Sequence, residues 1–372
     1  MKKKIKVCHL TSVHHRYDTR ILYKECISLK NHGLDVHLIV ADEKEDEVFE
    51  GISIHSVGKT EGKISRFIKA TKRVFNKALD LDADIYHFHD PELLPYGKKL
   101  KKKGKVVIYD THEDLPRQLM SKEYVPILAR RPLALGMEWY EDNIVKNFDA
   151  VITATPHISK RFSRLNDTVV DINNFPLLSD LDLQVTKWET KRNEICYIGS
   201  ITEIRGLSQI ILATSLLPNI VLNLAGSVAP KSYLQTLSSL DGWTKTNYMG
   251  QINRNEVKSV MKQSKVGLVT FLPYGNHIHS QPNKLFEYMA QGIPLVASNF
   301  DLWKEIVERY DCGICVNPRD PEAIAGAIKF LLEHDELSEK KGQNGRNAIL
   351  EKFNWDSEQK KLTGLYDMLL KH

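Results

Sequence analysis

The chain is poor in the features that mark secreted and membrane proteins. Its 372 residues include five cysteines. They are scattered and form no disulfide framework, so we expect a reducing compartment. No window reaches about 18 uninterrupted apolar residues, so a membrane-spanning helix is not expected. The opening Met1-Lys2-Lys3-Lys4 is like the start of a signal peptide, but residues 5–10 are short, alternating and polar, and no cleavage site follows. We therefore expect a cytoplasmic protein.

Two further absences narrow the function. No G-x-G-x-x-G follows the first expected strand, which argues against a dinucleotide-dependent dehydrogenase. Aromatic residues make up 8% of the chain and do not cluster with the lysines, as a stacking platform for nucleic acid would require. We expect no nucleic-acid partner.

The positive charge is uneven. The net charge is +5, and residues 1–175 carry all of the excess, with 30 basic and 25 acidic residues. A basic amphipathic helix is expected over 63–79, and six lysines crowd residues 98–105. A basic half beside a neutral half indicates an anionic surface facing one domain, such as a membrane. The same helix can equally pack its apolar stripe on a sheet and leave its lysines in water.

Short apolar segments alternate with helical stretches along the chain. In the first half, strands are expected at residues 5–10, 35–40, 52–57, 85–87, 106–110 and 150–153. In the second half, they are expected at 194–198, 221–225, 246–249, 266–272, 295–297 and 313–316. This rhythm predicts an α/β fold of two Rossmann-like, doubly wound parallel-sheet domains, with ligands at the carboxyl ends of the strands. The expected domains are 1–175 and 193–356, joined by a polar linker at 176–192 and followed by a helix at 357–372.

The most informative stretch is residues 280–297. A strand and a loop lead into about three helical turns, which Gly292 and Pro294 end. Lys284 and Glu287 are three residues apart and share one face near the positive end of this helix. A helix N-terminus with a lysine binds an anion such as phosphate, and a carboxylate can accept two ribose hydroxyls. The segment therefore suits a nucleotide diphosphate with a sugar attached.

The same segment resembles the signature of the retaining family-four glycosyltransferases, which have the GT-B fold, and in particular bacterial O-antigen and capsule glycosyltransferases. Residues 287–294 match the second half of that signature, while His279 stands where the family has its first glutamate. The resemblance implies two domains facing a central cleft, a last helix that crosses back to the first domain, and metal-independent chemistry without a cofactor. It also implies that Asn283 and His279 contact the donor.

The passage around residues 197–207 resembles the family's Gly-Arg…Lys-Gly passage, whose basic residues hold the donor diphosphate. Arg205 falls in the lysine position and Ser200 replaces the arginine. Arginine keeps its charge at any working pH and can engage two phosphate oxygens. Gly250 ends a segment that resembles a wall of the nucleotide pocket. We expect Arg205 and Lys284 to act in catalysis, and Ser200 and Gly250 to bind the donor.

In the first domain, the loop after the first strand offers His14, Arg16 and Asp18 as candidates for contact with acceptor or diphosphate. His89 follows another expected strand and joins them. The position of His112 resembles that of the histidine that contacts the donor sugar in this family, so His112 is a catalytic candidate. A metal cluster is conceivable from His89, Asp90, His112 and Glu113, but none has helical i, i+4 spacing, and no metal is expected there.

Taken with these features, the family resemblance implies a retaining hexosyltransferase. The expected donor is a UDP-sugar, with UDP-GalNAc or UDP-GlcNAc as the first choices. The expected acceptor is a polyprenyl-diphosphate-linked saccharide of O-antigen or capsule synthesis, met on the inner face of the membrane by a peripheral protein. Two alternatives fit the same residues: a UDP-sugar epimerase, and a non-catalytic nucleotide-binding or scaffold protein.

Overall fold

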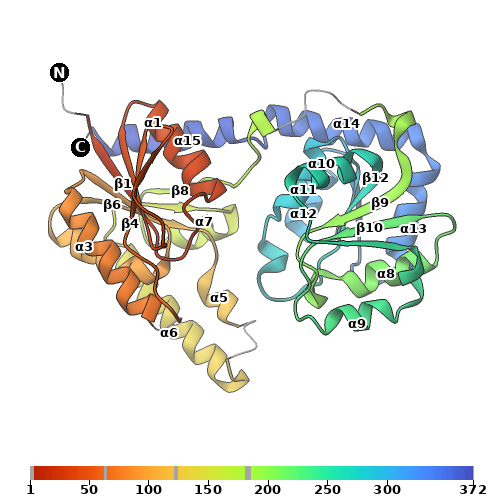
Figure 1. The fold of residues 1–372 in the computed structure, drawn as a ribbon, viewed down its shortest axis with the longest axis horizontal. Helices are drawn as coiled ribbons and strands as arrows, with labels where there is room; N and C mark the ends of the chain where they lie inside the picture. Colours follow the sequence, from red (N-terminus) through yellow and green to blue (C-terminus); the bar gives the residue numbers. More distant parts are fainter. Residues whose placement is uncertain (1–3, 63–64, 121–124, 181–185, 372) are drawn as a thin grey trace. The chain divides into compact units, whose positions relative to one another are not determined.

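The structure is a computed structural model that describes residues 4–62, 65–120, 125–180 and 186–371. It divides into two compact units: unit 1 is Met1–Asn174 with Trp355–His372, and unit 2 is Phe175–Asn354. Each unit is built on one sheet with helices on both of its faces (Figure 1). The expected α/β class is confirmed in both units.

The sheet of unit 1 has the order β3-β4-β2-β1-β5-β6-β7-β8. Its strands are β1 (Lys6–Leu10), β2 (Asp35–Val40), β3 (Glu47–Phe49), β4 (Ile52–Ser56), β5 (Ile85–Phe88), β6 (Val106–Thr111), β7 (Ala150–Thr153) and β8 (Val169–Asp171). All neighbouring pairs are parallel except β3 with β4, so the expectation of purely parallel sheets is corrected here. The strands β3 and β8 were not expected, because three residues are too few to show a hydrophobic period.

The helical segments of unit 1 cover both faces of this sheet. They are η1 (Thr19–Cys26), α1 (Ile27–Asn31), η2 (Arg66–Ala70), α3 (Thr71–Leu81), η3 (Pro91–Leu93), α4 (Leu94–Lys102), α5 (Leu115–Leu119), α6 (Ile127–Val145), α7 (Pro156–Phe162) and α15 (Trp355–Leu369). η1 and η2 are π-helical. η1 buries the charged side chains of Arg20, Lys24 and Glu25, which the sequence pattern does not predict because charged residues are seldom buried without a partner.

The basic amphipathic helix expected over 63–79 is formed by η2 and α3, and residues 63 and 64 lie outside the described residues. Val74, Phe75 and Ala78 are buried, as the packing interpretation of its apolar stripe requires. Phe67 and Ile68, two apolar residues of η2, are exposed. They lie in the π-helical turn, whose i to i+5 bonding shifts side chains away from the stripe of α3.

The C-terminal helix α15 belongs to unit 1, where it packs on η1 and α1. Its Trp355 Nε1 donates to Ser28 Oγ (2.9 Å), and the hydroxyl of its Tyr366 lies 2.9 Å from His87 Nδ1. Its Glu358 carboxylate accepts from the backbone N–H of Asn173 (2.7 Å). None of the helices in the described ranges has the length and apolar composition of a membrane span.

The sheet of unit 2 is parallel throughout and has the order β11-β10-β9-β12-β13-β14. Its strands are β9 (Arg192–Ile198), β10 (Val221–Ala225), β11 (Thr246–Gly250), β12 (Ser264–Val269), β13 (Leu295–Ser298) and β14 (Gly313–Val316). Six strands were expected at these places. β12 begins and ends earlier than expected, because Thr270, Phe271 and Leu272 continue the apolar run into the following loop.

The helices of unit 2 are α8 (Leu207–Ser215), α9 (Tyr233–Ser238), α10 (Arg254–Gln263), α11 (Asn283–Ala290), α12 (Asp301–Val307), α13 (Pro321–Glu333) and α14 (Asp335–Glu351). The expected linker, 176–192, belongs to this unit, and its residues 181–185 lie outside the described ranges. Trp188 is buried and donates through Nε1 to Asp335 (3.0 Å). Lys191 donates to the carbonyls of Lys262 and Ser264. This part of the segment therefore packs as part of unit 2.

Candidate functional site

Each sheet reverses its strand order at one point. In unit 2, β10 and β11 follow β9 on one side, and β12 to β14 continue on the other. The order of unit 2 thus reverses between β9 and β12, and that of unit 1 reverses between β1 and β5. Doubly wound sheets bind their ligands at such a switch point, beyond the carboxyl ends of the two strands. The candidate residues of both units follow these strands or their neighbours.

In unit 2 the ends of three neighbouring strands are formed by glycines. Gly199, Gly226 and Gly250 lie at the ends of β9, β10 and β11, and all three have positive φ. A Cβ on Gly226 would lie 1.7 Å from the carbonyl oxygen of Gly199. The N–H of Gly226 also donates to the carbonyl of Gly250 (2.7 Å). The ends of β9, β10 and β11 therefore pack backbone against backbone.

Arg205 lies at this switch point. It ends the short 3-10 helix η6 (Glu203–Arg205) after β9, and its guanidinium lies 4.8 Å from the ring centre of Phe271, which follows β12. The N–H of Leu272 donates to the carbonyl of Ile204 (2.9 Å), which ties the two loops together. Burial raises the pKa of Tyr197 to about 12 although the charge of Arg205 opposes the shift. Arg205 is therefore a positioned cation between the ends of β9 and β12.

The helix α11 follows β12 and carries Asn283, Lys284 and Glu287. Among the described residues, no side chain caps its N-terminus at Pro282, so its first N–H groups keep their donor capacity. Lys284 Nζ pairs with the Glu287 carboxylate, and both side chains are partly exposed. The preceding loop is held by Trp303, whose Nε1 donates to the Ser280 carbonyl (2.7 Å). An uncapped helix N-terminus with a lysine is an anion site.

Two other residues expected to bind the sugar donor, Ser200 and His279, lie near the switch point of unit 2. Ser200 follows Gly199, its side chain is exposed, and its carbonyl accepts from the Tyr197 hydroxyl (2.9 Å). His279 ends the 3-10 helix η8 (Gly275–His279) and is exposed. Both precede a segment that carries one of the cations, Arg205 or Lys284.

In unit 1, His14 lies between two carboxylates. Its Nδ1 is 3.6 Å from Asp18 and its Nε2 is 3.5 Å from Asp90, while its ring centre is 4.8 Å from that of His112. Burial by itself would lower the pKa of His14, but the hydrogen bond to Asp18 and the charges of Asp90, Asp18 and Asp110 outweigh it and raise the pKa. His14 is thus biased toward the protonated form.

The buried carboxylate of Asp110 holds the ring of His112. Its Nε2 lies 2.9 Å from Asp110 Oδ2, and the buried Asp110 also accepts two bonds from Arg20 (2.9 and 3.0 Å). Burial would raise the pKa of Asp110, but the charge of Arg20 and the contacts with His112 and His89 lower it well below its usual value. The carboxylate therefore fixes the orientation of His112, whose ring reaches solvent.

Beneath these groups is a fully buried cluster of three histidines and a glutamate: His9, Glu25, His87 and His89. Burial lowers the pKa of His89 to about 4, and it raises the pKa of Glu25 well above its usual value. His89, a candidate for acceptor contact, is thus enclosed and reaches the surface through His112, whose Nε2 is 3.3 Å away.

Arg16 was expected to contact acceptor or diphosphate, but its side chain is buried within unit 1. Its side chain is 1% exposed, and it binds Asp42 through two nitrogens and Glu47 through a third. These partners follow β2 and belong to β3, so Arg16 anchors the loop 11–18 to the edge of the sheet. The charge that was expected to meet acceptor or diphosphate is neutralised inside unit 1.

Both units match family models of glycosyltransferases. Residues 19–173 match the model described as Glycosyltransferase Family 4. Residues 179–348 match the model described as Glycosyl transferases group 1. The chain belongs to the GT-B glycosyltransferases. The resemblance drawn from residues 280–297 is therefore confirmed at the level of the family.

Similar proteins agree with this assignment. An uncharacterized glycosyltransferase of Methanocaldococcus jannaschii is 26% identical over 182 residues, which are 47% of this chain and 45% of that protein. The match thus spans less than half of this curated relative. Sucrose-phosphate synthase from Thermosynechococcus elongatus has a TM-score of 0.79 at 17% identity, over 99% of this chain and all of the other. HepE of Anabaena, solved in complex with UDP-glucose, has a TM-score of 0.71 at 12% identity, over 98% of this chain and all of the other. At these identities the structural likeness shows the fold.

In this GT-B chain, sequence reasoning missed the residues that hold the candidates in place. Arg20, Asp110 and Glu25 are buried beneath the histidines of unit 1. Trp303 fixes the loop before α11, and Phe271 lies under Arg205. The sequence offered one signal for them: Arg20 and Glu25 lie in a segment that faces the sheet. Charged residues are seldom fully buried without a partner, so this position indicates a buried ion pair.

Proposed function

We propose that this member of the GT-B family transfers a sugar from a UDP-sugar to an acceptor hydroxyl with retention at the anomeric carbon. The observation that carries the proposal is the switch point of unit 2. There Arg205 follows β9, and the uncapped N-terminus of α11 with Lys284 follows the adjacent strand β12, while glycines end β9, β10 and β11. A diphosphate needs this combination of backbone N–H groups, two cations and close approach. UDP is further supported by HepE, which was solved with UDP-glucose.

The proposed chemistry needs no protein nucleophile. The bond between the anomeric carbon and the β-phosphate oxygen breaks, and the acceptor oxygen bonds to the same face of that carbon. The acceptor proton passes to the departing phosphate. Negative charge therefore grows on the β-phosphate, where Arg205, Lys284 and the N–H groups of α11 stabilise it electrostatically.

The remaining candidates position the donor. Glu287 accepts hydrogen bonds from the ribose hydroxyls, while Asn283, Ser200 and Gly250 border the nucleotide. His279 borders the sugar, for which an N-acetylhexosamine is our first choice, and His112 is the catalytic candidate of unit 1. Lys284 and Glu287 pair with each other in the structure. Donor binding would exchange this exposed pair, which contributes little by itself, for one contact to phosphate and one to ribose.

The test is Lys284→Ala, with Lys329→Ala as a matched control in an exposed ion pair on α13. A panel of UDP-, GDP- and TDP-sugars is screened first by thermal shift, and the best binder is then used for transfer. We expect Lys284→Ala to lower kcat/KM at least about tenfold, since it removes a charge that faces the leaving phosphate. Lys329→Ala should change kcat/KM less than twofold. Transfer by Lys284→Ala at the wild-type rate would refute the site, and conversion of the UDP-sugar without acceptor would instead indicate an epimerase.

We propose a polyprenyl-diphosphate-linked saccharide of O-antigen or capsule synthesis as the acceptor, and an anionic membrane surface as the place where it is met. The support comes from α6, which extends away from the sheet of unit 1 (Figure 1). Its Leu128 is 93% exposed and its Trp139 69% exposed. Other apolar side chains on the same helix are also exposed, namely Ile127, Leu133 and Leu135. Exposed apolar side chains in such number indicate an interaction surface.

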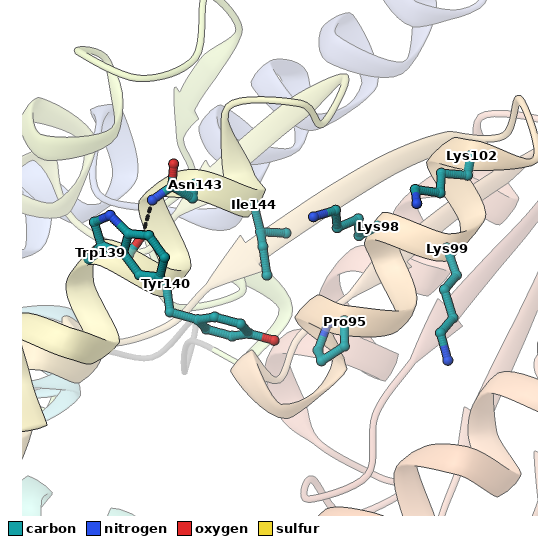
Figure 2. A pocket seen from close by; sticks show the side chains of 8 residues that line it. All are labelled: Pro95, Lys98, Lys99, Lys102, Trp139, Tyr140, Asn143 and Ile144. Atoms are coloured by element: carbon teal, nitrogen blue, oxygen red, sulfur yellow. Dashed lines mark hydrogen bonds between the residues drawn. The ribbon is translucent and has the colours of Figure 1, made fainter.

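Positive charge borders this apolar surface. A groove of about 460 Å³ between α4 and α6 is lined by Pro95, Lys98, Lys99, Lys102, Trp139, Tyr140, Asn143 and Ile144. In Figure 2, Tyr140 and Ile144 point from α6 toward α4, and Lys98 points toward α6. Among the described residues, no carboxylate lies within ion-pair distance of Lys98, Lys99 or Lys102. Apolar side chains beside uncompensated lysines suit lipid tails beneath anionic head groups.

Co-sedimentation with anionic vesicles tests this part independently of catalysis. We expect binding at low salt that weakens several-fold at high salt, since the Debye length shortens from about 30 Å at 0.01 M to about 3 Å at 1 M. The double variant Leu128→Asp/Trp139→Asp should lose most of the binding, and Leu216→Asp, an exposed leucine of unit 2, should retain it. Absence of binding at low salt would contradict the proposal. A dimer that the double variant dissociates would assign the surface to a second copy of the chain.

A further inference from the structure

The fully buried cluster of unit 1 brings four potential metal ligands together. They are His9 on β1, Glu25 on η1, His87 on β5 and His89 just after β5, each with a side chain that is 0% exposed. One ligand atom from each lies within 4.8 Å of all the others. The strand register places His9 directly beside His87, and η1 brings Glu25 over both. The cluster therefore joins two strands and a helix that are far apart in sequence.

Two of the facing atoms of this cluster are not satisfied by the protein, while His9 Nδ1 and His89 Nε2 lie within hydrogen-bond distance of each other (3.0 Å). His87 Nε2 and Glu25 Oε2 are buried and have no hydrogen-bond partner among the described residues. His87 Nε2 and His89 Nε2 both lie 3.9 Å from Glu25 Oε2, and His9 Nδ1 lies 4.0 Å from it. These distances are too long for hydrogen bonds. Buried polar atoms are almost always paired. The unpaired atoms of His87 and Glu25 therefore indicate that a ligand binds between the four side chains.

The outer nitrogens of two histidines are already held. His87 Nδ1 lies 2.9 Å from the Tyr366 hydroxyl, and His89 Nδ1 lies 3.1 Å from Asp110 Oδ2. A histidine whose Nδ1–H donates to an oxygen presents the lone pair of Nε2 on its other side. This is the arrangement that supports metal-bound histidines in proteins, where the outer partner fixes tautomer and ring orientation.

The separations suit a small tetrahedral ion. Zinc with nitrogen and oxygen ligands at about 2.0–2.1 Å has neighbouring ligands roughly 3.3 Å apart. In the cluster, His9 Nδ1 and His89 Nε2 are 3.0 Å apart, and the distances to the Glu25 oxygen are 3.9 to 4.0 Å. Three imidazoles and one carboxylate exclude calcium and magnesium, which take oxygen ligands. The nearby Arg20 pairs with Asp110 (2.9 Å) and with the outer carboxylate oxygen of Glu25, Oε1 (3.0 Å), so the proposed ligand atom of Glu25 is Oε2.

We propose that His9, Glu25, His87 and His89 bind one Zn²⁺ ion as a closed structural site. Because all four ligands come from the protein and are buried, the ion has no open position for a substrate, and it takes no part in glycosyl transfer. It is enclosed as the chain folds, and it links β1 and β5 to η1 beneath the loop that carries His14. The site is independent of the donor site of unit 2.

The test begins with the wild-type chain and needs no variant. The protein is unfolded in denaturant with a chelator and refolded with Zn²⁺, with Mg²⁺, or with chelator alone, and bound metal is measured by mass spectrometry after dialysis. We expect one zinc per chain, no bound magnesium, and a Tm about 5 °C or more higher for the zinc-refolded protein at a hundredfold excess over Kd. Refolded protein that holds less than about a tenth of a zinc per chain and shows no shift in Tm would overturn the proposal.

Variants then assign the ligands. His87→Ala and the more conservative Glu25→Gln should each lower bound zinc at least tenfold, with circular dichroism confirming a folded chain. The control is His37→Ala, which removes a half-buried histidine of β2 that faces His55 on the same sheet. It should retain one zinc. Full zinc content in folded Glu25→Gln and His87→Ala would place the metal elsewhere and refute this site. Because bound metal is counted directly, failure here is distinguishable from failure of the proposed transferase activity.

Discussion

The switch points of the two units occupy the same place in the same kind of sheet but are built from different material. In unit 2, glycines form the ends of β9, β10 and β11, and the charges come from Arg205 and from Lys284 on α11. In unit 1, the strand ends bear histidines and aspartates that are bonded to one another, with the Arg20–Asp110 pair fully buried beneath them. Topology thus fixes where a site can form, and side-chain size and charge decide what it can bind.

The two switch points also differ in the free energy that it costs to remove or exchange a charged group. An exposed backbone edge with cations can be emptied and filled by a polyanion without leaving a buried charge unpaired. A network such as that of unit 1 is expensive to disturb, because removing one partner leaves another desolvated charge without compensation. Unit 2 is therefore suited to exchange a charged ligand, and unit 1 to hold groups in fixed orientations.

Arg20→Met gives the largest expected effect and breaks the network of unit 1. Asp110 and Glu25 lose their buried cation, so we expect the free energy of unfolding to fall by about 3–5 kcal/mol. Chemical denaturation followed by circular dichroism measures this loss. Lys329→Met, in an exposed pair on α13, should cost less than about 1 kcal/mol. Equal small losses for both variants would show that the buried network is not under electrostatic constraint.

Gly226→Ala tests the backbone edge of unit 2. Its Cβ would lie 1.7 Å from the carbonyl of Gly199, and its φ of +147° is strained for alanine. We expect a loss of at least about 2 kcal/mol together with weaker binding of UDP-sugar in a thermal-shift titration. Gly326→Ala on α13 has open space and should stabilise the helix by up to about 1 kcal/mol. Undiminished binding by Gly226→Ala would separate this edge from the donor site.

His14→Gln gives the smallest expected effect and depends on pH. The folded-state pKa of His14 is raised by Asp18, Asp90 and Asp110, while its ring contacts His112. Its stabilising contribution is therefore complete below about pH 6.5, the unfolded value, and is lost as the pH rises through the raised folded value. The variant should lose more stability at pH 5.5 than at pH 8.5 in urea denaturation. Equal losses at both pH values would mean that protonation of His14 does not contribute.

Much of the fold was predictable because its signals are local. β2, β7, β10 and β14 have the bounds expected from their apolar runs. The exceptions have physical causes. β3 and β8 are three residues long, which is too short to show the period on which such predictions depend. A short edge strand such as β3 is decided by the neighbour it pairs with.

The candidate site was predictable to different degrees in the two units. Arg205, Lys284 and Glu287 lie in contiguous motifs whose spacing and helix position already indicate an anion site. In unit 1 the sequence pointed to His14, His89 and His112 but not to the groups that orient them. Arg16 shows the limit clearly, because a loop arginine is expected to meet solvent or ligand and is instead buried against Asp42.

The sequence by itself determined the alternation of strands and helices, the glycine and lysine motifs of unit 2, and through them the family. These properties depend on neighbours within a few residues, which local periodicity and spacing record. Only the tertiary structure decided which charged side chains are buried and which partners they bind. Arg20 meets Asp110 across 90 positions, and His87 meets Tyr366 across 279. Contacts at such separations arise from the crossing of strands and helices, so the buried histidine cluster could be seen only in the folded chain.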